Sequence, residues 1–186
     1  MEEKKRIRTK IQKRRMDMSP DEWTEKTGRI FRNTVRHPLF QRAKTIYCYV
    51  DFRREAGTEE IMREAWKLGK KVAVPRTEGK EMDFYYIESL QELTVGHFGV
   101  REPKPTALAD GKEGLVIMPG SAFDRKCHRI GYGMGYYDRY LREHPSLDTM
   151  ALAFSFQVLE QIPSEPFDIN PGVIITEDGM IETAVD

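Results

Sequence analysis

Residues 45–75 decide the fold, because TIYCYVDFRREAGTEEIMREAWKLGKKVAVP contains the signals of a strand, a helix and a second strand. Thr45–Val50 is a run of apolar, β-branched and aromatic residues, which predicts a buried strand. Thr58 can cap a helix whose apolar positions share one face, and Gly69 can end that helix. Lys71–Pro75 then predicts the next strand. A strand, a crossover helix and a parallel strand form a right-handed βαβ unit.

Short apolar runs continue this pattern along the chain. Leu115–Met118 (LVIM), Met150–Phe154 (MALAF) and Val173–Thr176 (VIIT) are continuous, as in parallel strands that are covered on both faces. Met82–Ile87 (MDFYYI) predicts a strand nearer an edge, and 94–114, rich in Gly and Pro, predicts a long functional loop. The alternation predicts an α/β domain, a three-layer sandwich with a mostly parallel sheet. Ligands of such sheets lie beyond the carboxyl ends of the strands.

Composition places the chain among globular proteins. Its 186 residues, 39% apolar and 32% charged, predict a single domain over 1–186. The net charge is zero, which argues against a general surface for binding polyanions. No apolar run approaches the ~20 residues that span a bilayer, and the basic N-terminus lacks the apolar segment of a secretory signal. Two cysteines, Cys48 and Cys127, cannot form a disulfide framework, so we expect a cytoplasmic, reduced setting.

A basic helix is predicted at about 2–16. Residues 1–15 contain eight Lys or Arg and two Glu, a net charge of +6. At 100° per residue, one face of this helix carries two isoleucines that can dock it and cations that flank the contact. The members of that face are Lys4, Ile7, Arg8, Ile11 and Arg15. From charge alone, a solvated basic helix is the favoured alternative.

A second helix is predicted directly after it. Ser19 fits the N-cap, Pro20 fits the first turn, and Glu22 stands where a capping box needs an acid. Apolar residues then keep a helical period, and the helix should end before Pro38, because the residue before a proline is pushed out of helical geometry.

The segment 118–139, MPGSAFDRKCHRIGYGMGYYDR, carries the chemistry. It follows a predicted buried strand and precedes the amphipathic helix Tyr136–His144. Glycine at positions 131, 133 and 135 allows close approach of a ligand and positive φ, and the amides at a helix N-terminus form an anion site. Arg129 adds a planar cation suited to phosphate. The segment lacks the G-K-[ST] of a P-loop, and its glycine spacing differs from the dinucleotide fingerprint.

Asp138 lies in the first turn of this helix, and two interpretations of it are open. A carboxylate beside a phosphate site is where a Mg²⁺ ligand is needed. A carboxylate in a first turn also interacts with the helix dipole, and here it could pair with Arg142 at i, i+4. The residues alone do not decide between these two interpretations.

These motifs strongly resemble the 5-formyltetrahydrofolate cyclo-ligases, also called 5,10-methenyltetrahydrofolate synthetases. The resemblance rests on MPGSAFD (118–124), RIGYGMGYYDR (129–139) and MALAFSFQ (150–157) with EPFD (165–168), and it extends over essentially the whole chain. It implies a fold similar to the sugar-phosphate isomerase and CoA-transferase group. It also implies closure of 5-formyltetrahydrofolate to 5,10-methenyltetrahydrofolate with ATP and Mg²⁺, releasing ADP and phosphate. In that reaction the formyl oxygen attacks the γ-phosphate, and N10 then attacks the activated carbon.

The resemblance implies an ATP site made of two segments. Lys4 and Arg8 fit the K-x-x-x-R of the family, whose i, i+4 spacing puts both cations on one helix face. Arg129 and Tyr136 are implied as catalytic residues, and Asp138 and Asp168 as ligands of Mg²⁺. The whole ATP-binding set is Lys4, Arg8, Arg129, Ile130, Gly131, Tyr132, Gly133, Met134, Gly135, Tyr136 and Tyr137.

The resemblance implies a folate site beside it. Glu55 fits a carboxylate that accepts hydrogen bonds from the donor edge of the pterin. Val50, Tyr132 and Tyr136 are implied to line the folate pocket, where aromatic faces can stack on the pterin.

Three departures from the family pattern stand out. Pro171-Gly172 stands where the family has a second aspartate, so only Asp168 is carried over. His128 replaces a small residue, and we expect it to be exposed. Tyr132 and Met134 occupy glycine-loop positions where the family often has a basic residue, so phosphate contacts are expected to rest more on other cations.

Two alternative functions follow from the same residues. One is an α/β protein that binds ATP or folate without turnover; the other is a nucleic-acid-binding module that uses the basic helix, against which the zero net charge argues. For the favoured function we expect two small-molecule partners, ATP and 5-formyltetrahydrofolate, with Mg²⁺. Nucleic acid and membrane are not expected as partners, and the protein is expected to be a monomer.

Overall fold

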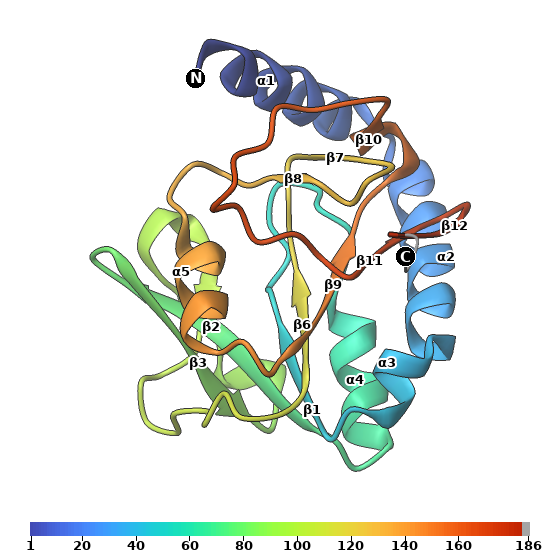
Figure 1. Cartoon of the computed structure of the whole chain (residues 1–186). Coiled ribbons are helices and arrows are strands. Elements are labelled where there is room, and N and C mark those ends of the chain that lie inside the picture. The colour runs from blue at the N-terminus through green and yellow to red at the C-terminus, as the bar shows by residue number, and fades with distance from the viewer. Residues whose placement is uncertain (184–186) are drawn as a thin grey trace.

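The computed structural model, which describes residues 1–183, is built on a seven-stranded sheet (Figure 1). Its strands are β1 (Thr45–Cys48), β2 (Lys71–Glu78), β3 (Glu81–Ile87), β6 (Leu115–Met118), β9 (Asp148–Leu152), β11 (Val173–Thr176) and β12 (Gly179–Glu182). The order is β12-β11-β9-β6-β1-β2-β3. The five central strands are parallel, and β12 and β3 pair antiparallel at the two edges. The predicted α/β class with a mostly parallel sheet is confirmed, as is the edge position of β3.

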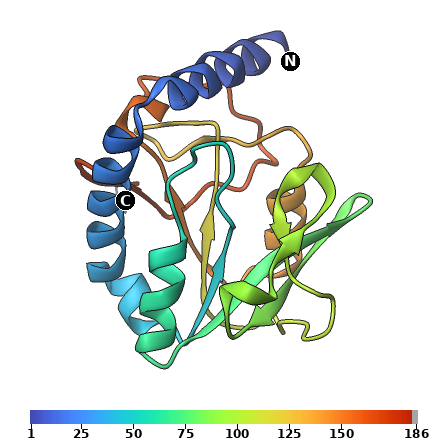
Figure 2. The ribbon, with the colours of Figure 1, turned by 180° about the vertical axis from the view of Figure 1, so that it is seen from behind.

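Helices cover both faces of this sheet, as Figures 1 and 2 show. One face carries α2 (Pro20–Arg36), α3 (Pro38–Arg42) and α4 (Glu59–Lys67). The opposite face carries α5 (Tyr136–Glu143) and the segment that contains β7 (Ala122–Asp124) and β8 (Arg129–Ile130). Helix α1 (Glu2–Asp17) lies across the end of the sheet to which the central strands point (Figure 1). The likeness to the sugar-phosphate isomerase and CoA-transferase group stays a prediction.

The central strands are apolar throughout because both faces of the sheet are buried. In β1, Ile46 and Cys48 pack toward the α2–α4 side, whereas Tyr47 between them packs toward the α5 side. Successive side chains of a strand point to opposite faces, so a strand between two layers of helices needs apolar residues at every position. Phe40 on one side and Phe84 on the other fill the two halves of the core.

Two small sheets were not predicted. One contains β10 (Val158–Leu159), β7 and β8, and the other pairs β4 (Thr94–Val95) with β5 (Arg101–Glu102). The segment 94–114 is therefore not wholly the long loop that was expected, since it begins with a hairpin. Single turns of 3₁₀ helix lie at Leu90–Glu92, His97–Gly99 and Ser155–Gln157. Within residues 1–183, no helix combines the length and the apolar composition needed to cross a bilayer.

Helix α1 docks on the small sheet through its apolar positions. Ile11 is buried with Ala122, Ile130 and Ile162, and Ile7 packs against the same cluster. The predicted basic helix is therefore present and packed, and its two isoleucines make the contact that was expected of them.

The helix caps agree with the sequence in one case and differ in another. The Ser19 hydroxyl accepts a hydrogen bond from the backbone N–H of Glu22 at 3.1 Å, as predicted for α2. Thr58 stands at the N-cap of α4, but its hydroxyl donates to Asp51 at 3.0 Å and does not cap the helix. Gly69 follows α4 with φ of 72°, a left-handed conformation that favours glycine.

The Ser19 cap gives a test of the fold. Ser19→Ala leaves the N–H of Glu22 without its acceptor, so we expect unfolding free energy to fall by about 1 kcal/mol. The melting temperature should fall by roughly 2–4 °C, measured by circular dichroism. Ser164→Ala, at an exposed serine between β10 and β11, is the matched control and should leave the melting temperature unchanged. Equal melting of both variants would contradict the capping role.

Candidate active site

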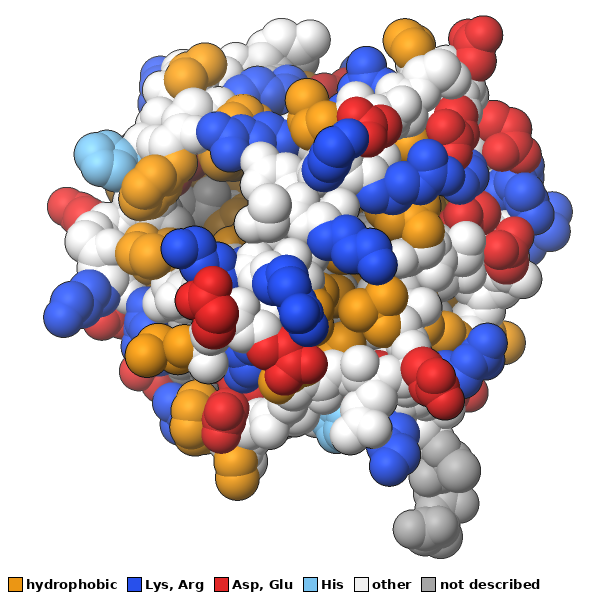
Figure 3. Space-filling model, turned by 90° about the horizontal axis from the view of Figure 1, so that it is seen from above, with side chains coloured by type: hydrophobic (Ala, Val, Ile, Leu, Met, Phe, Trp, Pro, Cys, Tyr) orange, Lys and Arg blue, Asp and Glu red, His pale blue; other side chains and the backbone are white. Residues whose placement is uncertain are grey.

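A cavity of about 790 Å³ opens at the carboxyl ends of β1 and β6. Its walls come from α1, the β1–α4 loop, the β4–β5 hairpin and the glycine-rich loop before α5. Figure 3 shows this end of the molecule, where Lys and Arg side chains gather around a hollow bordered by hydrophobic ones. Every site residue expected from the sequence lines the cavity, namely Lys4, Arg8, Val50, Glu55, Arg129, Ile130, Gly131, Tyr132, Gly133, Met134, Gly135, Tyr136, Tyr137, Asp138 and Asp168.

The glycine loop joins β8 to the first turn of α5. Gly133 has φ of 101° and Gly135, the N-cap of α5, has φ of 68°; a side chain would strain the backbone at both positions. The guanidinium of Arg8 lies over Gly133, and its Nε donates to the carbonyl oxygen of Gly131 at 2.8 Å. The loop therefore offers a bare backbone and a helix N-terminus to the cavity, with a cation above it.

Arg129 and Asp138 form an ion pair at the base of this loop. Nη2 of Arg129 lies 3.2 Å from Oδ1 of Asp138, and Nη1 donates to the carbonyl of Pro119 at 3.2 Å. The backbone N–H of Ile169 also donates to Oδ1 of Asp138, at 2.9 Å. The alternative pairing of Asp138 with Arg142 is therefore wrong, because Arg142 donates to the carbonyl of Phe167 instead.

Lys4 and Asp168 form a second ion pair in the wall of the cavity. Nζ of Lys4 lies 3.3 Å from Oδ2 of Asp168, which also accepts the backbone N–H of Glu165 at 2.9 Å. This contact joins the first turn of α1 to the segment before β11, so residues 164 positions apart meet at the cavity.

The oxygens of Asp138 and Asp168 suit a small hard cation. The hydrogen bonds of Asp138 are accepted by Oδ1 and those of Asp168 by Oδ2, so one oxygen of each has no partner among residues 1–183. The described part of the chain has no group of three or more His, Cys, Asp or Glu that could hold a metal. Mg²⁺ is usually held by one or two carboxylates together with substrate phosphates, so Asp138 and Asp168 are the residues that could hold it.

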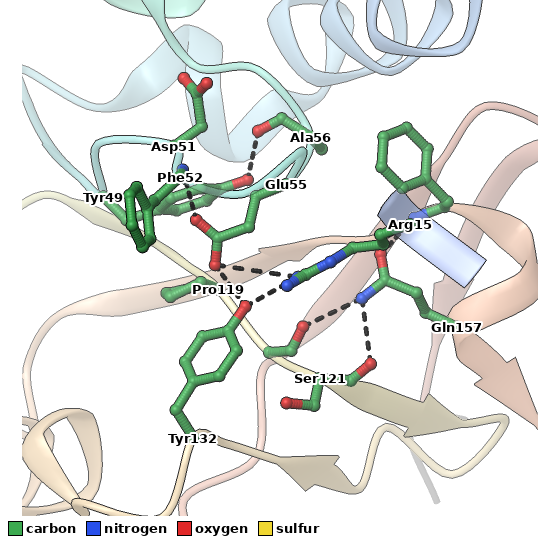
Figure 4. A network of polar contacts seen from close by, with 12 residues as sticks. Arg15, Tyr49, Asp51, Phe52, Glu55, Ala56, Pro119, Ser121, Tyr132 and Gln157 are labelled. Carbon is green, nitrogen blue, oxygen red and sulfur yellow. Dashed lines mark hydrogen bonds and ion pairs between the residues drawn. The ribbon is translucent and has the colours of Figure 1, made fainter. Parts of the chain in front are cut away.

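Glu55 also lines the cavity, in a network of polar contacts that includes Tyr132 of the glycine loop (Figure 4). The Tyr132 hydroxyl donates to Oε1 of Glu55, and the backbone N–H of Phe52 donates to Oε2 at 2.8 Å. Nη1 of Arg15 donates to the Tyr132 oxygen at 2.9 Å and lies 3.9 Å from Oε1 of Glu55. Only 9% of the surface of Glu55 is exposed. Burial raises the pKa of Glu55 to about 6, against the opposing effects of Tyr132, Arg15 and the Phe52 amide.

The β1–α4 loop is shaped to present this carboxylate. Asp51 accepts the backbone N–H of Thr58 at 2.9 Å and also its hydroxyl, which closes the loop at its base. The Tyr49 hydroxyl donates to the carbonyl of Ala56 at 2.6 Å, and the Trp23 indole donates to the carbonyl of Glu55 at 2.9 Å. Because these contacts hold the loop at its base and the backbone of Glu55 and Ala56, the carboxylate has a fixed position in the loop after β1.

Two expected side chains have positions that the sequence did not indicate. Tyr136 gives its ring to the cavity, but its hydroxyl donates to the carbonyl of Gly79 in the β2–β3 turn at 3.0 Å. The expectation that His128 is exposed is wrong: it is half-buried, because Nδ1 lies 2.9 Å from Oδ2 of the buried Asp124. That contact closes the β7–β8 hairpin.

Several residues that sequence reasoning did not assign also line the cavity. They are Ile11, Gln12, Arg15, Phe52, Arg53, Thr77, His97, Phe98, Glu102 and Phe167, with others. Glu102 is buried and accepts the Thr77 hydroxyl at 3.1 Å, which ties the β4–β5 hairpin to β2. Of these, Ile11 and Arg15 left a signal in the sequence, because they share the helix face of Lys4 and Arg8.

Known proteins resemble the chain in both sequence and structure. The sequence profile of the 5-formyltetrahydrofolate cyclo-ligase family matches residues 1–177. The 5-formyltetrahydrofolate cyclo-ligase of Mus musculus is 28% identical, over 94% of each chain. That of Escherichia coli strain K12 is 26% identical, over 89% of this chain and 96% of its own.

A solved structure supports the same relationship. The NMR structure of 5,10-methenyltetrahydrofolate synthetase from Aquifex aeolicus superposes with a TM-score of 0.87. It is 29% identical in sequence and covers 98% of this chain and 94% of its own. The chain therefore belongs to the 5-formyltetrahydrofolate cyclo-ligase family.

Proposed function

We propose that this cavity is the active site in which the chain performs the reaction of its family, the ATP-dependent conversion of 5-formyltetrahydrofolate to 5,10-methenyltetrahydrofolate. One observation carries the proposal: a glycine-rich loop at the N-terminus of α5, two cations of α1 and a buried carboxylate meet in a single cavity. A volume of about 790 Å³ is within the range of cavities that hold ligands of this kind.

The ATP half of the site is assigned to α1 and the glycine loop. The backbone amides of Gly131–Tyr137 can approach the phosphates, while Lys4 and Arg8 supply positive charge from the opposite side. Arg129 lies under the loop and lines the cavity, where its guanidinium adds positive charge beside the phosphates. Asp138 and Asp168 would hold Mg²⁺, which neutralises charge on the phosphates when it is bound.

The folate half is assigned to Glu55 and the surfaces around it. The carboxylate can accept N–H groups of the pterin, and the ring of Tyr132 and the side chain of Val50 supply flat, apolar contact. Burial keeps water from competing for these hydrogen bonds, so the carboxylate fixes the orientation of the pterin.

The reaction then follows from bringing the two halves together. The formyl oxygen forms a bond to the γ-phosphorus as ADP leaves, and N10 next attacks the formyl carbon as the C–O bond to phosphate breaks and N10 loses its proton. Arg129 and Lys4 stabilise negative charge on the transferring group, which is the main catalytic contribution available to a protein in phosphoryl transfer. Arg129 is thus proposed as catalytic, and Tyr136 as a ring that shapes the wall.

Lys4, Arg8 and Arg15 face the cavity, which reduces the basic surface that α1 could offer to nucleic acid. We propose small molecules as the partners of this protein, a monomeric state, and a cytoplasmic location.

Turnover with purified protein tests the proposal directly. We expect 5,10-methenyltetrahydrofolate to form with one ATP consumed per product, followed by its near-ultraviolet absorbance. Chelation of the metal should stop the reaction, and added Mg²⁺ should restore it. Product formation that persists under chelation would contradict the metal role, and binding of both ligands without product would favour the non-catalytic alternative.

The variant Asp138→Asn tests the metal-binding role of this carboxylate directly. The amide keeps the shape of the side chain but loses the charge that a hard cation requires, so we expect turnover to fall at least about a hundredfold. Glu143→Gln, at the exposed end of α5, makes the same chemical change and should keep full activity. Glu143→Gln should melt as the parent protein does, whereas Asp138→Asn should melt lower, because the buried Arg129 loses its charged partner. Turnover is therefore compared at a temperature where both variants are folded. Near-normal turnover by Asp138→Asn would leave only a structural role for this residue.

Variants in the two halves of the site should affect the binding of different ligands. Arg8→Ala should weaken binding of a non-hydrolysable ATP analogue by roughly ten- to a hundredfold, because a charge-assisted hydrogen bond is worth about 1.5–3 kcal/mol. Glu55→Gln should weaken 5-formyltetrahydrofolate by a similar factor, since the amide replaces an acceptor oxygen with a donor. Arg6→Ala, on the exposed face of α1, is the control. Calorimetric titration that finds equal losses for both ligands in both variants would refute the division.

The pKa of Glu55 predicts how folate binding depends on pH. The ionised carboxylate is the form that only accepts hydrogen bonds, so affinity should rise as pH increases through about 6 and then level off. Below pH 6 the affinity should fall by up to ~10-fold per pH unit. In Glu55→Gln this dependence should be absent between pH 5 and 8. Titrations of both proteins across this range provide the measurement, and parallel profiles would contradict the role of Glu55.

A further inference from the structure

Arg15 is a buried cation of the cavity to which neither half of the proposed site assigns a role. Its side chain comes from the last turn of α1, and only 4% of the residue is exposed. Figure 4 shows the guanidinium pointing from α1 toward Tyr132 and Glu55. Within residues 1–183, the side chain donates a hydrogen bond from Nη1 to the Tyr132 oxygen. Its guanidinium carbon lies 5.9 Å from the centre of the Tyr132 ring.

The fold itself does not explain a guanidinium at this position. Taking a charge out of water is costly, and an apolar residue of similar volume often serves stability as well as a buried ion pair does. Arg15 contacts two residues of the proposed folate site, and its Nε has no hydrogen-bond partner within residues 1–183. The polar contacts of this guanidinium are therefore made to the proposed folate site.

The direction of the hydrogen bonds indicates what Arg15 does. An arginine can only donate, so the Tyr132 oxygen must accept from Nη1. The hydroxyl proton of Tyr132 is then free to point at Oε1 of Glu55, which accepts it. Arg15 thus orders Tyr132 as a donor toward the carboxylate, and its positive charge lies 3.9 Å from the same oxygen.

We propose that Arg15 is a positioning residue that keeps Glu55 ionised and holds Tyr132 against it, so that α1 controls the folate carboxylate as well as the phosphates. The proposal rests on the assignment of Glu55 to folate binding. It adds a residue on the helix that also carries Lys4 and Arg8.

The other groups that face Glu55 cannot replace this charge. Tyr132 and Tyr137 approach from the glycine loop and the start of α5, and Tyr49 and Asp51 lie on the side of β1 and its loop. The three tyrosines are neutral, since burial raises their pKa values, and Asp51 carries negative charge that opposes ionisation of Glu55. Arg15 supplies the positive charge among these groups.

Arg15→Met tests the proposal in the ligand-free protein. Carbon-13 NMR of labelled glutamate carboxyls reports the pKa of Glu55, whose signal is identified by its loss in Glu55→Gln. Without the nearby cation we expect this pKa to rise from about 6 by at least about one unit. Lys10→Met removes the same charge from the exposed face of α1 and should leave the pKa unchanged. An unchanged pKa in Arg15→Met would overturn the proposal.

Folate binding provides the second measurement. If Arg15 acts through Glu55, a one-unit rise in its pKa should lower the affinity of Arg15→Met for 5-formyltetrahydrofolate about fivefold at pH 6 and less than about 1.5-fold at pH 8. Equal losses at the two pH values would mean that Arg15 contacts the folate directly, and would overturn the positioning role. Arg15→Lys, which keeps the charge, should restore most of the affinity at pH 6.

Two further experiments distinguish failure of the Arg15 proposal from failure of the folate assignment of Glu55. If Arg15→Met does not fold, Tyr132→Phe removes the bridging hydroxyl without changing any charge and should also raise the pKa of Glu55; no rise would overturn the proposal. If Glu55→Gln binds folate as the parent protein does, the folate assignment of Glu55 fails. The NMR result for Arg15 then still decides whether α1 controls the charge of Glu55.

Discussion

The docking of α1 by Ile7 and Ile11 is the contact on which the candidate site depends. Ile11 is almost fully buried against the small β7–β8–β10 sheet, and burial of such a side chain contributes about 1.5–3 kcal/mol. Without this contact, a helix with so much positive charge would be expected to stay in solvent. Once the isoleucines are in place, the helical period carries three cations into the cavity, whereas the remaining basic residues stay exposed. A small apolar contact thus fixes the position of all the charge that the helix contributes.

The charges of the free cavity are arranged in opposed pairs. Lys4 faces Asp168 and Arg129 faces Asp138, and each acid keeps one oxygen without a partner in the described part of the chain. An isolated charge in such a site would be costly, so mutual pairing stabilises the cavity before any ligand enters. Phosphates and a cation would then join existing pairs, so little reorganisation is needed. The same pairing explains why Asp138 does not contact Arg142: the buried guanidinium of Arg129 offers a stronger partner than an exposed one.

The sequence predicted the central strands because burial on both faces demands apolar residues at every position, as in LVIM of β6. It did not predict β10, β7 and β8, because strands of two or three residues are too short to show a period. The sequence predicted which residues line the candidate site, but it did not predict which of them contact one another. Glycines and charges in a loop indicate phosphate, yet which acid meets which cation depends on how segments far apart in the chain pack. Thr58 shows the same limit: it stands at the N-cap position of α4, but its hydroxyl donates to Asp51 and not to the helix.

The spacing of Lys4, Arg8 and Arg15 connects these observations. At 1.5 Å per residue, a helix separates positions 4 and 15 by roughly 16 Å, far enough for one rigid element to contact both the segment before β11 and the β1–α4 loop. A flexible loop could supply the same charges but would lose side-chain and backbone freedom each time it met a ligand. On a docked helix, the cations at the phosphate end and the cation beside Glu55 move together. A displacement of α1 that disturbs one half of the cavity must therefore disturb the other, which is the physical basis for expecting the two substrates to influence each other's binding.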